Sequence, residues 1–205
     1  WDIYLGDLRQ GVKTKLLLER EGTWFPVDWS PQGDQALILK YISINRAELH
    51  LLDIAKGTAR PLLGHGKEAM AIGAAAFSAD GKGFYFSGDG GSEFRHLRYY
   101  SFEEGKVTSS WEAIPWDVDE IAPSPKGGVV AFTVNEGGRS RLYLLREGKA
   151  EAAASIPVGL ISNLRFHPDG SRLAMVINTP RTPGDAYVLA IAGEALTRWT
   201  FSEVG

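Results

Sequence analysis

The chain has 205 residues, of which 44% are hydrophobic and 23% are charged, and it carries a formal net charge of −3 with no cysteine. This balance is typical of a folded globular protein and argues against disorder. The absence of cysteine excludes disulfides, thiolate metal sites and cysteine nucleophiles, and the lack of excess positive charge argues against nucleic acid as the main ligand. The longest run of apolar or glycine residues, 69–77, is far shorter than the roughly 20 residues of a membrane span, so we expect no span.

The first predicted elements are two strand-like runs, 1–8 and 15–19, with a glycine turn at position 11 between them. The sequence starts inside the first run without an initiator methionine, so we expect a truncated start, with any targeting segment outside the chain. The sequence leaves the compartment open, and we favour the cytoplasm over the periplasm.

A turn motif then recurs along the chain. It reads V-D-W-S-P-Q-G at 27–33, A-A-F-S-A-D-G at 75–81, I-A-P-S-P-K-G at 121–127 and L-R-F-H-P-D-G at 164–170. The final glycine recurs every 43–48 residues, and a second glycine series follows at positions 57, 105, 148 and 193. In such turns proline pre-sets its φ, aspartate bonds its own backbone and glycine takes a positive φ. We therefore predict a tight turn at each glycine of the two series.

Short runs rich in branched and aromatic residues flank these turns. They occupy 36–39, 84–87, 129–134 and 173–177 after the first glycine series, and 48–53, 96–100, 141–145 and 186–190 before the second. Runs of this kind, bounded by turn residues, predict β-strands. A sustained helical period is missing, although the alanine-rich segment 67–76 could hold a short helical turn. The chain is therefore predicted to be all-β.

The repeat length identifies the architecture. Four short strands in 43–48 residues match a β-propeller blade, for which repeats of about 40–50 residues are typical. We predict a propeller fragment with four complete four-stranded antiparallel blades, 21–64, 65–112, 113–157 and 158–205, and the outer half of a fifth, 1–20. In each complete blade the first glycine turn joins the first two strands and the second glycine turn joins the last two. Because an open arc leaves sheet edges exposed, we expect a tendency to self-association.

The S-P-D-G-type hairpins resemble those of TolB-like propellers and of the N-terminal propellers of prolyl oligopeptidase-family serine peptidases. Three longer stretches are similar to the propellers of bacterial dipeptidyl and acylaminoacyl peptidases: YISINRAELHLLD at 41–53, FTVNEGGRSRLY at 132–143, and PGDAYVL at 183–189 followed by LTRWTFSEVG at 196–205. In that family the propeller caps an α/β-hydrolase domain with a Ser-Asp-His triad. The resemblance implies that Gly205 lies near the junction to such a domain and that peptides are its substrates.

The chain itself offers no catalytic residue. A nucleophile elbow needs G-x-S-x-G, and the nearest candidates, Ser92 and Ser140, lack the second glycine. The histidines form no close ligand pair, and Asp117, Asp119 and Glu120 fit a solvated channel wall better than a hard-cation site. We therefore predict no metal and no cofactor.

A functional surface would lie at the central channel and its mouths, where the inner strands and the connecting loops converge. Five residues are candidates for it by their place in the repeat: Trp116, Asp117, Asn135, Glu136 and Arg181. Two functions stay open. In the first, the chain is a non-catalytic propeller that caps and gates the active site of a prolyl oligopeptidase-like peptidase and admits only short peptides. In the second, it is a TolB-like platform for a protein partner with no enzyme domain.

Overall fold

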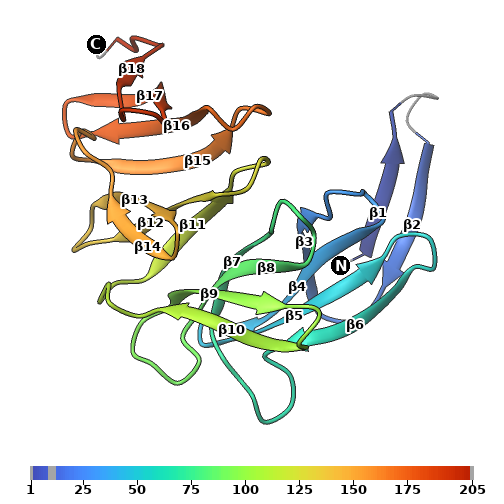
Figure 1. Ribbon diagram of the computed structural model, residues 1–205. Helices are drawn as coiled ribbons and strands as arrows, with labels where there is room; N and C mark the ends of the chain where they lie inside the picture. The colour runs from blue at the N-terminus through green and yellow to red at the C-terminus, as the bar shows by residue number, and fades with distance from the viewer. Residues whose placement is uncertain (1, 9–12, 204–205) are drawn as a thin grey trace.

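The computed structural model describes residues 2–8 and 13–203, which form 18 β-strands without a helix. The first two strands, β1 (Asp2–Asp7) and β2 (Lys13–Glu19), pair into a two-stranded antiparallel sheet. The predicted turn at Gly11 lies outside the described residues. Figure 1 shows this sheet at one end of an arc of sheets, with the C-terminal sheet at the other end.

Four antiparallel sheets of four strands follow, each in simple sequential order. They comprise β3 (Thr23–Trp29), β4 (Gln35–Ser43), β5 (Arg46–Asp53) and β6 (Thr58–Leu63); β7 (Ile72–Phe77), β8 (Gly83–Gly88), β9 (His96–Ser101) and β10 (Lys106–Trp111); β11 (Val118–Pro123), β12 (Val129–Asn135), β13 (Ser140–Arg146) and β14 (Lys149–Ala152); and β15 (Leu160–Phe166), β16 (Arg172–Thr179), β17 (Thr182–Ala190) and β18 (Leu196–Arg198). We call these sheets blades 1 to 4. The predicted all-β propeller fragment is confirmed, whereas the helical turn considered for 67–76 is wrong, because 67–71 is a connector without helix and 72–76 belongs to β7.

The two glycine series have the predicted role. At the first series each glycine N–H donates to the carbonyl oxygen three residues earlier, over 2.8–2.9 Å, and φ is +68° to +75°. The second series has φ between +64° and +77°. L-residues with a Cβ rarely adopt this conformation, so the glycines end the strands at the same place in every blade.

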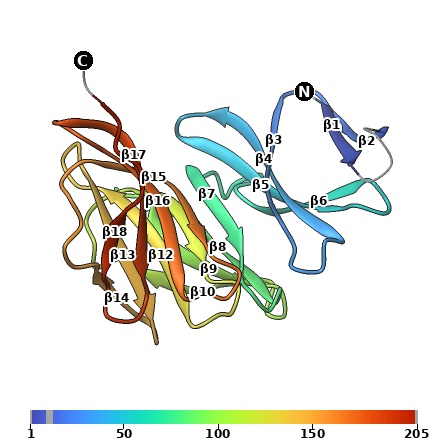
Figure 2. The ribbon, with the colours of Figure 1, turned by 90° about the horizontal axis from the view of Figure 1, so that it is seen from above.

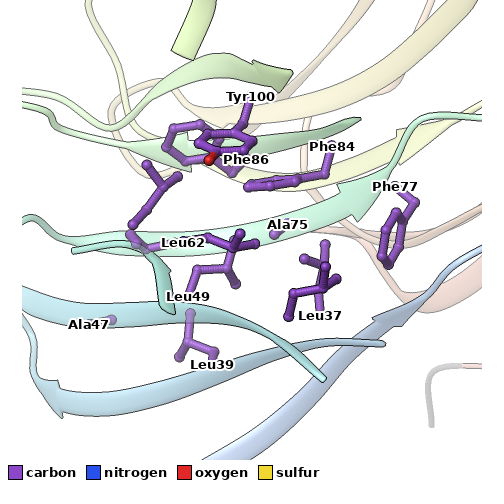
Figure 3. Packing of buried hydrophobic residues seen from close by; sticks show 13 residues of the cluster. Leu37, Leu39, Ala47, Leu49, Leu62, Ala75, Phe77, Phe84, Phe86 and Tyr100 are labelled. Carbon is purple, nitrogen blue, oxygen red and sulfur yellow. The ribbon is translucent and has the colours of Figure 1, made fainter. Parts of the chain in front are cut away.

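The core lies between the blades. Four clusters of buried apolar side chains join the two-stranded sheet to blade 1, blade 1 to blade 2, blade 2 to blade 3, and blade 3 to blade 4. The second is the largest, and Figure 3 shows Leu37 and Leu49 of blade 1 facing Phe77 and Phe84 of blade 2. Because each blade buries one face against the next, an isolated blade would expose most of its apolar side chains.

Each inner strand carries an irregularity where it pairs with the second strand of its blade. The register shifts between Pro26 and Asp28, between Ile72 and Ala75, between Val118 and Glu120, and between Ser162 and Arg165. Such β-bulges re-aim side chains and leave an amide unpaired in the sheet. In blades 2 and 3 a fully buried hydroxyl of the second strand, Ser87 or Thr133, accepts the N–H of Ala74 or Glu120. The bulges therefore set which side chains face the channel.

Candidate binding site in the central channel

The inner strands β3, β7, β11 and β15 follow one another along the arc, each in contact with the next, and form the channel wall (Figure 1); Figure 2 shows the same arc from above. Carboxylates tie neighbouring strands together. Asp28 accepts the N–H of Phe77 at 2.8 Å, and the two oxygens of Glu120 accept the N–H groups of Asn163 and Leu164, both at 3.0 Å. Bonds from side chain to backbone thus cross the boundaries between blades 1 and 2 and between blades 3 and 4, in addition to the packing between blades.

One end of the channel, formed by the turns between first and second strands, holds a cavity of about 330 Å³. The second residue of the repeated turn motif lines it in every blade: Asp28, Ala76, Ala122 and Arg165. Two alanines thus stand between a carboxylate and a guanidinium. Burial raises the pKa of Asp28, an effect opposed by the N–H groups of Phe77 and Trp29 and by the positive charge of Arg165. We call this the turn end.

The opposite end, which we call the loop end, holds a cluster of three charged side chains. Arg95 donates its backbone N–H to Asp117 at 2.8 Å, and its guanidinium lies 3.2 Å from Asp117 and 3.7 Å from Asp119. Burial raises the pKa of Asp119; Arg95 opposes this shift, and the negative charges of Asp117 and Glu120 add to it. Two carboxylates against one guanidinium leave a negative balance, which favours a cationic group in the channel mouth.

Gly73 of β7 makes room for this cluster. A Cβ placed on it would lie 2.7 Å from Nη1 of Arg95 and 2.7 Å from the hydroxyl oxygen of Ser87. A real Cβ essentially never comes so close, so a side chain here would displace the guanidinium and disturb the hydroxyl that accepts the N–H of Ala74. The present position of the charged cluster therefore favours glycine here, whereas the backbone conformation of Gly73 does not require one.

The sequence candidates Trp116, Asp117 and Asn135 meet at the loop end. The N–H of Asn135 donates to the carbonyl oxygen of Asp117 at 3.0 Å, and its side-chain oxygen accepts the N–H of Gly138 at 2.9 Å. The ring of Trp116 lies 6.2 Å from that of Phe94 and packs against the apolar cluster between blades 2 and 3. Trp116 and Asn135 thus shape the connections around the cluster, whereas Asp117 belongs to it.

The other two candidates lie at the same end of the molecule but outside the charged cluster. Glu136 pairs with Arg139 and Arg141, each at 3.3 Å, beside a hollow of about 220 Å³ between blade 3 and the connector 153–158 that follows it. Arg181 is exposed in the turn between β16 and β17, where its N–H donates to the hydroxyl of Thr179. The structure therefore does not bring these two side chains to Asp117.

Sequence reasoning missed Arg95, Asp28 and Arg165. A signal existed for the last two, because both occupy the second place of the repeated turn motif, where the other two blades have alanine. Arg95 carried no such signal, since it follows a glycine-rich loop of irregular length. Within the described residues, no group of three or more histidine, aspartate or glutamate side chains could hold a metal ion. The described ranges also contain no helix long and apolar enough to cross a membrane.

Solved structures with this architecture support the assignment of the fold. TolB from Acinetobacter baumannii superposes on 99% of the chain with a TM-score of 0.77 and 17% sequence identity. The fold is that of a TolB-like β-propeller. A prolyl endopeptidase, from a study of inter-domain dynamics in catalysis and specificity, matches 91% of the chain with a TM-score of 0.71 and 17% identity. A puromycin hydrolase mutant complexed with PGG matches 90%, with a TM-score of 0.71 and 20% identity.

The TolB-like propeller described here spans only part of these proteins. It covers 49% of the TolB chain, 28% of the prolyl endopeptidase chain and 30% of the puromycin hydrolase chain. Neither a protein-family model nor a curated protein sequence matches it. Because the identities are low, the likeness establishes the architecture, and function has to be argued from the channel.

Proposed function

We propose that the chain is the non-catalytic propeller of a prolyl oligopeptidase-like serine peptidase, where it caps the active site and admits only short peptides. The observation that carries the proposal is the channel, which has the pair Asp28 and Arg165 at its turn end and the cluster of Arg95, Asp117 and Asp119 at its loop end. The likeness to propellers of a prolyl endopeptidase and a puromycin hydrolase supports it.

The gating would be steric. The inner strands are hydrogen-bonded within their own sheets, and Asp28 and Glu120 tie them across two blade boundaries. We therefore expect the strands not to separate far enough to admit a folded protein. An extended peptide presents a much smaller cross-section. The negative balance at the loop end would attract a peptide's α-amino group or a basic side chain, and such charge complementarity steers and orients a ligand.

The proposed partner is an α/β-hydrolase catalytic domain that follows this chain, with short peptides as substrates. A second expected contact is self-association through the ends of the arc. Apolar side chains are exposed at both ends, namely Tyr4 and Leu16 on the two-stranded sheet and Leu160, Trp199 and Phe201 on and beside blade 4. Exposed sheet faces of this kind invite pairing with another chain.

The first test is the coding sequence that follows the codon of Gly205. The proposal expects a G-x-S-x-G within about 150–200 residues, with an aspartate and then a histidine further on. It also expects the 205-residue chain alone to leave a chromogenic peptide intact. A stop codon, further S-P-D-G repeats, or triad-type turnover by the chain alone contradicts it.

The second test addresses the channel. Binding of a labelled short peptide to the chain should weaken when Asp119 is replaced by asparagine, and the loss should be larger for a peptide with a free amino terminus than for its acetylated form. Glu103→Gln, an exposed change in the turn between β9 and β10, is the matched control. Equal binding of the two peptides by the unmodified chain would refute a role for the negative balance.

A second candidate function is a TolB-like interaction platform with no enzyme attached. The superposition of TolB on 99% of the chain is the observation that favours it. It predicts a stop codon or further propeller repeats after Gly205, together with saturable binding of a protein partner. The coding sequence therefore separates the two candidates before any binding experiment is done.

A further inference from the structure

A hollow of about 570 Å³ lies between blades 2 and 3 on the side of the turns, away from the loop end of the channel. Blade 2 contributes its first turn, residues 78–80, and blade 3 contributes residues 123–130 and its second turn, 147–148. This size is within the range of about 300–1,000 Å³ that ligand sites usually occupy. We call it the inter-blade groove. It shares residues 78–79 and 123–125 with the cavity at the turn end of the channel, but the channel function proposed above does not use its remaining lining residues.

One wall of the inter-blade groove is aromatic. Tyr85 of β8 lies 4.9 Å from the ring of Tyr99 on β9 and 6.2 Å from that of Trp111 at the end of β10. The three rings stand on successive strands of one sheet, so they form a ladder across its face. The indole N–H of Trp111 donates to the carbonyl oxygen of Gly148 at 2.9 Å and ties the ladder to the opposite blade. The rings are therefore fixed in place before any ligand arrives.

The opposite wall is apolar and rich in proline. It consists of Pro123, Pro125, Val129, Val130 and Leu145. A groove with flat rings on one side and such a wall on the other accepts a narrow, extended chain better than a helix.

Polar groups in the inter-blade groove lack partners within the part of the chain that the structure describes. The hydroxyls of the half-buried Tyr85 and Tyr99 make no hydrogen bond there. Asp80 uses one carboxylate oxygen for the hydroxyl of Ser78 and the N–H of Lys82, and these bonds lower its pKa and keep it charged. The groove thus offers two unused hydroxyl donors.

The charge of the lining adds a second requirement. Asp80 and Glu147 contribute two carboxylates, whereas the side chain of Lys126, the lysine among the lining residues, packs its Cβ and Cγ against Gly170 of blade 4. Glu147 makes no ion pair with another described residue. A ligand that fits should therefore carry acceptors for the hydroxyls, flat apolar rings for the ladder, and a positive charge beside the turn of Glu147.

We propose that the inter-blade groove binds an extended, proline-containing segment of a partner protein that is flanked by a basic residue. Prolines form the polyproline II helix, which presents carbonyl acceptors without N–H donors and packs its rings on aromatic side chains. The two tyrosine hydroxyls supply the matching donors, and the carboxylates match the basic residue.

The test is fluorescence anisotropy with the purified 205-residue chain and two labelled probes, a hexaproline peptide flanked by arginines and the same peptide with alternating glycine and serine. We expect saturable binding of the proline peptide only. The double variant Tyr85→Phe with Tyr99→Phe keeps both rings and should weaken binding about fivefold or more, since each lost hydrogen bond costs a few-fold in affinity. Tyr41→Phe, at an exposed tyrosine of β4, is the matched control and should bind normally.

A third variant isolates the charge. Glu147→Gln should reduce binding of the arginine-flanked peptide and leave a neutral hexaproline peptide unaffected. The proposal is overturned if no saturable binding occurs, if the glycine-serine peptide binds equally, or if the double variant binds as the unmodified chain does. It is also overturned if Asp119→Asn abolishes binding, because the peptide would then occupy the channel. None of these outcomes bears on whether a hydrolase domain follows Gly205.

Discussion

Replacing Glu120 by alanine removes the carboxylate that holds the inner strands of blades 3 and 4 together. Each of its oxygens accepts one backbone N–H of β15, from Asn163 and from Leu164, at 3.0 Å. Asn163 has a positive φ of 58°, so the strand turns at this point to aim both amides at the carboxylate. The variant therefore tests whether side chains stabilise the channel wall.

The expected loss of stability depends on whether each of the two amides finds another hydrogen-bond acceptor after the carboxylate is removed. A hydrogen bond to a charged group contributes about 1.5–3 kcal/mol, and a buried donor left without a partner costs about 1–3 kcal/mol. Asn163 is exposed, so water replaces its lost acceptor, whereas Leu164 is 5% exposed and its amide stays unpaired. We expect Glu120→Ala to lower the free energy of unfolding by about 2–3 kcal/mol. Glu120→Gln keeps one acceptor oxygen and should cost about 1 kcal/mol.

Urea unfolding and hydrogen exchange measure the effect. With a urea dependence of about 1–3 kcal/mol per M, the midpoint of Glu120→Ala should fall by about 1 M. Amide exchange in the peptide covering 160–166 should accelerate, while exchange in blade 1 should not change. Glu151→Ala, the same substitution at an exposed site of β14, is the control. An unchanged midpoint together with unchanged exchange at Leu164 would show that packing alone holds the two strands.

Three further predictions concern backbone and charge. Gly64→Ala should destabilise the chain strongly, because its Cβ would lie 2.1 Å from the backbone carbonyl oxygen of Ala47. Gly66→Ala is the control, since Gly66 also has a positive φ but a Cβ there would meet open space. It should lower the free energy of unfolding in urea by only about 1 kcal/mol. Burial alone would raise the pKa of Asp185, but hydrogen bonds from Ser202, Thr200 and Arg198 lower it to about 2. Above pH 4 the charged carboxylate should therefore keep residues 199–203 bound against blade 4, and this contact should be lost as the pH falls toward 2. The fluorescence of Trp199 measures the change. If Asp185→Asn leaves the fluorescence of Trp199 at pH 7 unchanged, the carboxylate does not hold this segment. In Asp28→Asn the amide oxygen can still accept the N–H of Phe77. Because burial raises the pKa of Asp28, its charge destabilises the folded chain at pH 7, and removing it should raise the urea midpoint of unfolding. This gain should disappear below pH 4, where Asp28 of the unmodified chain is protonated and uncharged.

Much of the architecture could be predicted because it depends on local rules. Gly33, Gly81, Gly127 and Gly170 close their turns with the expected bond and a positive φ. A residue with a Cβ is disfavoured in that conformation wherever the turn lies, so the signal survives without knowledge of the rest of the fold. The short runs rich in branched and aromatic residues between these turns then indicate strands, and the repeat length indicates blades.

The candidate site was predicted less well. Asp117 pairs with Arg95, which comes from another blade and was missed by the sequence analysis. Glu136 forms ion pairs with two arginines of its own blade instead of joining the cluster. Position in a repeat predicts the end of the molecule on which a side chain lies, but it does not predict which other side chain it meets there.

The all-β character, the turn positions and the succession of strands could be read from the sequence, because each follows from the conformational preferences of a few adjacent residues. That Asp28 and Arg165 line one cavity, and that Tyr85, Tyr99 and Trp111 form a ladder, became visible in the folded molecule. These groupings join residues of different strands and blades. They depend on the bulge in each inner strand and on the packing between blades, and a shift of one residue in register would turn the side chains to the opposite face.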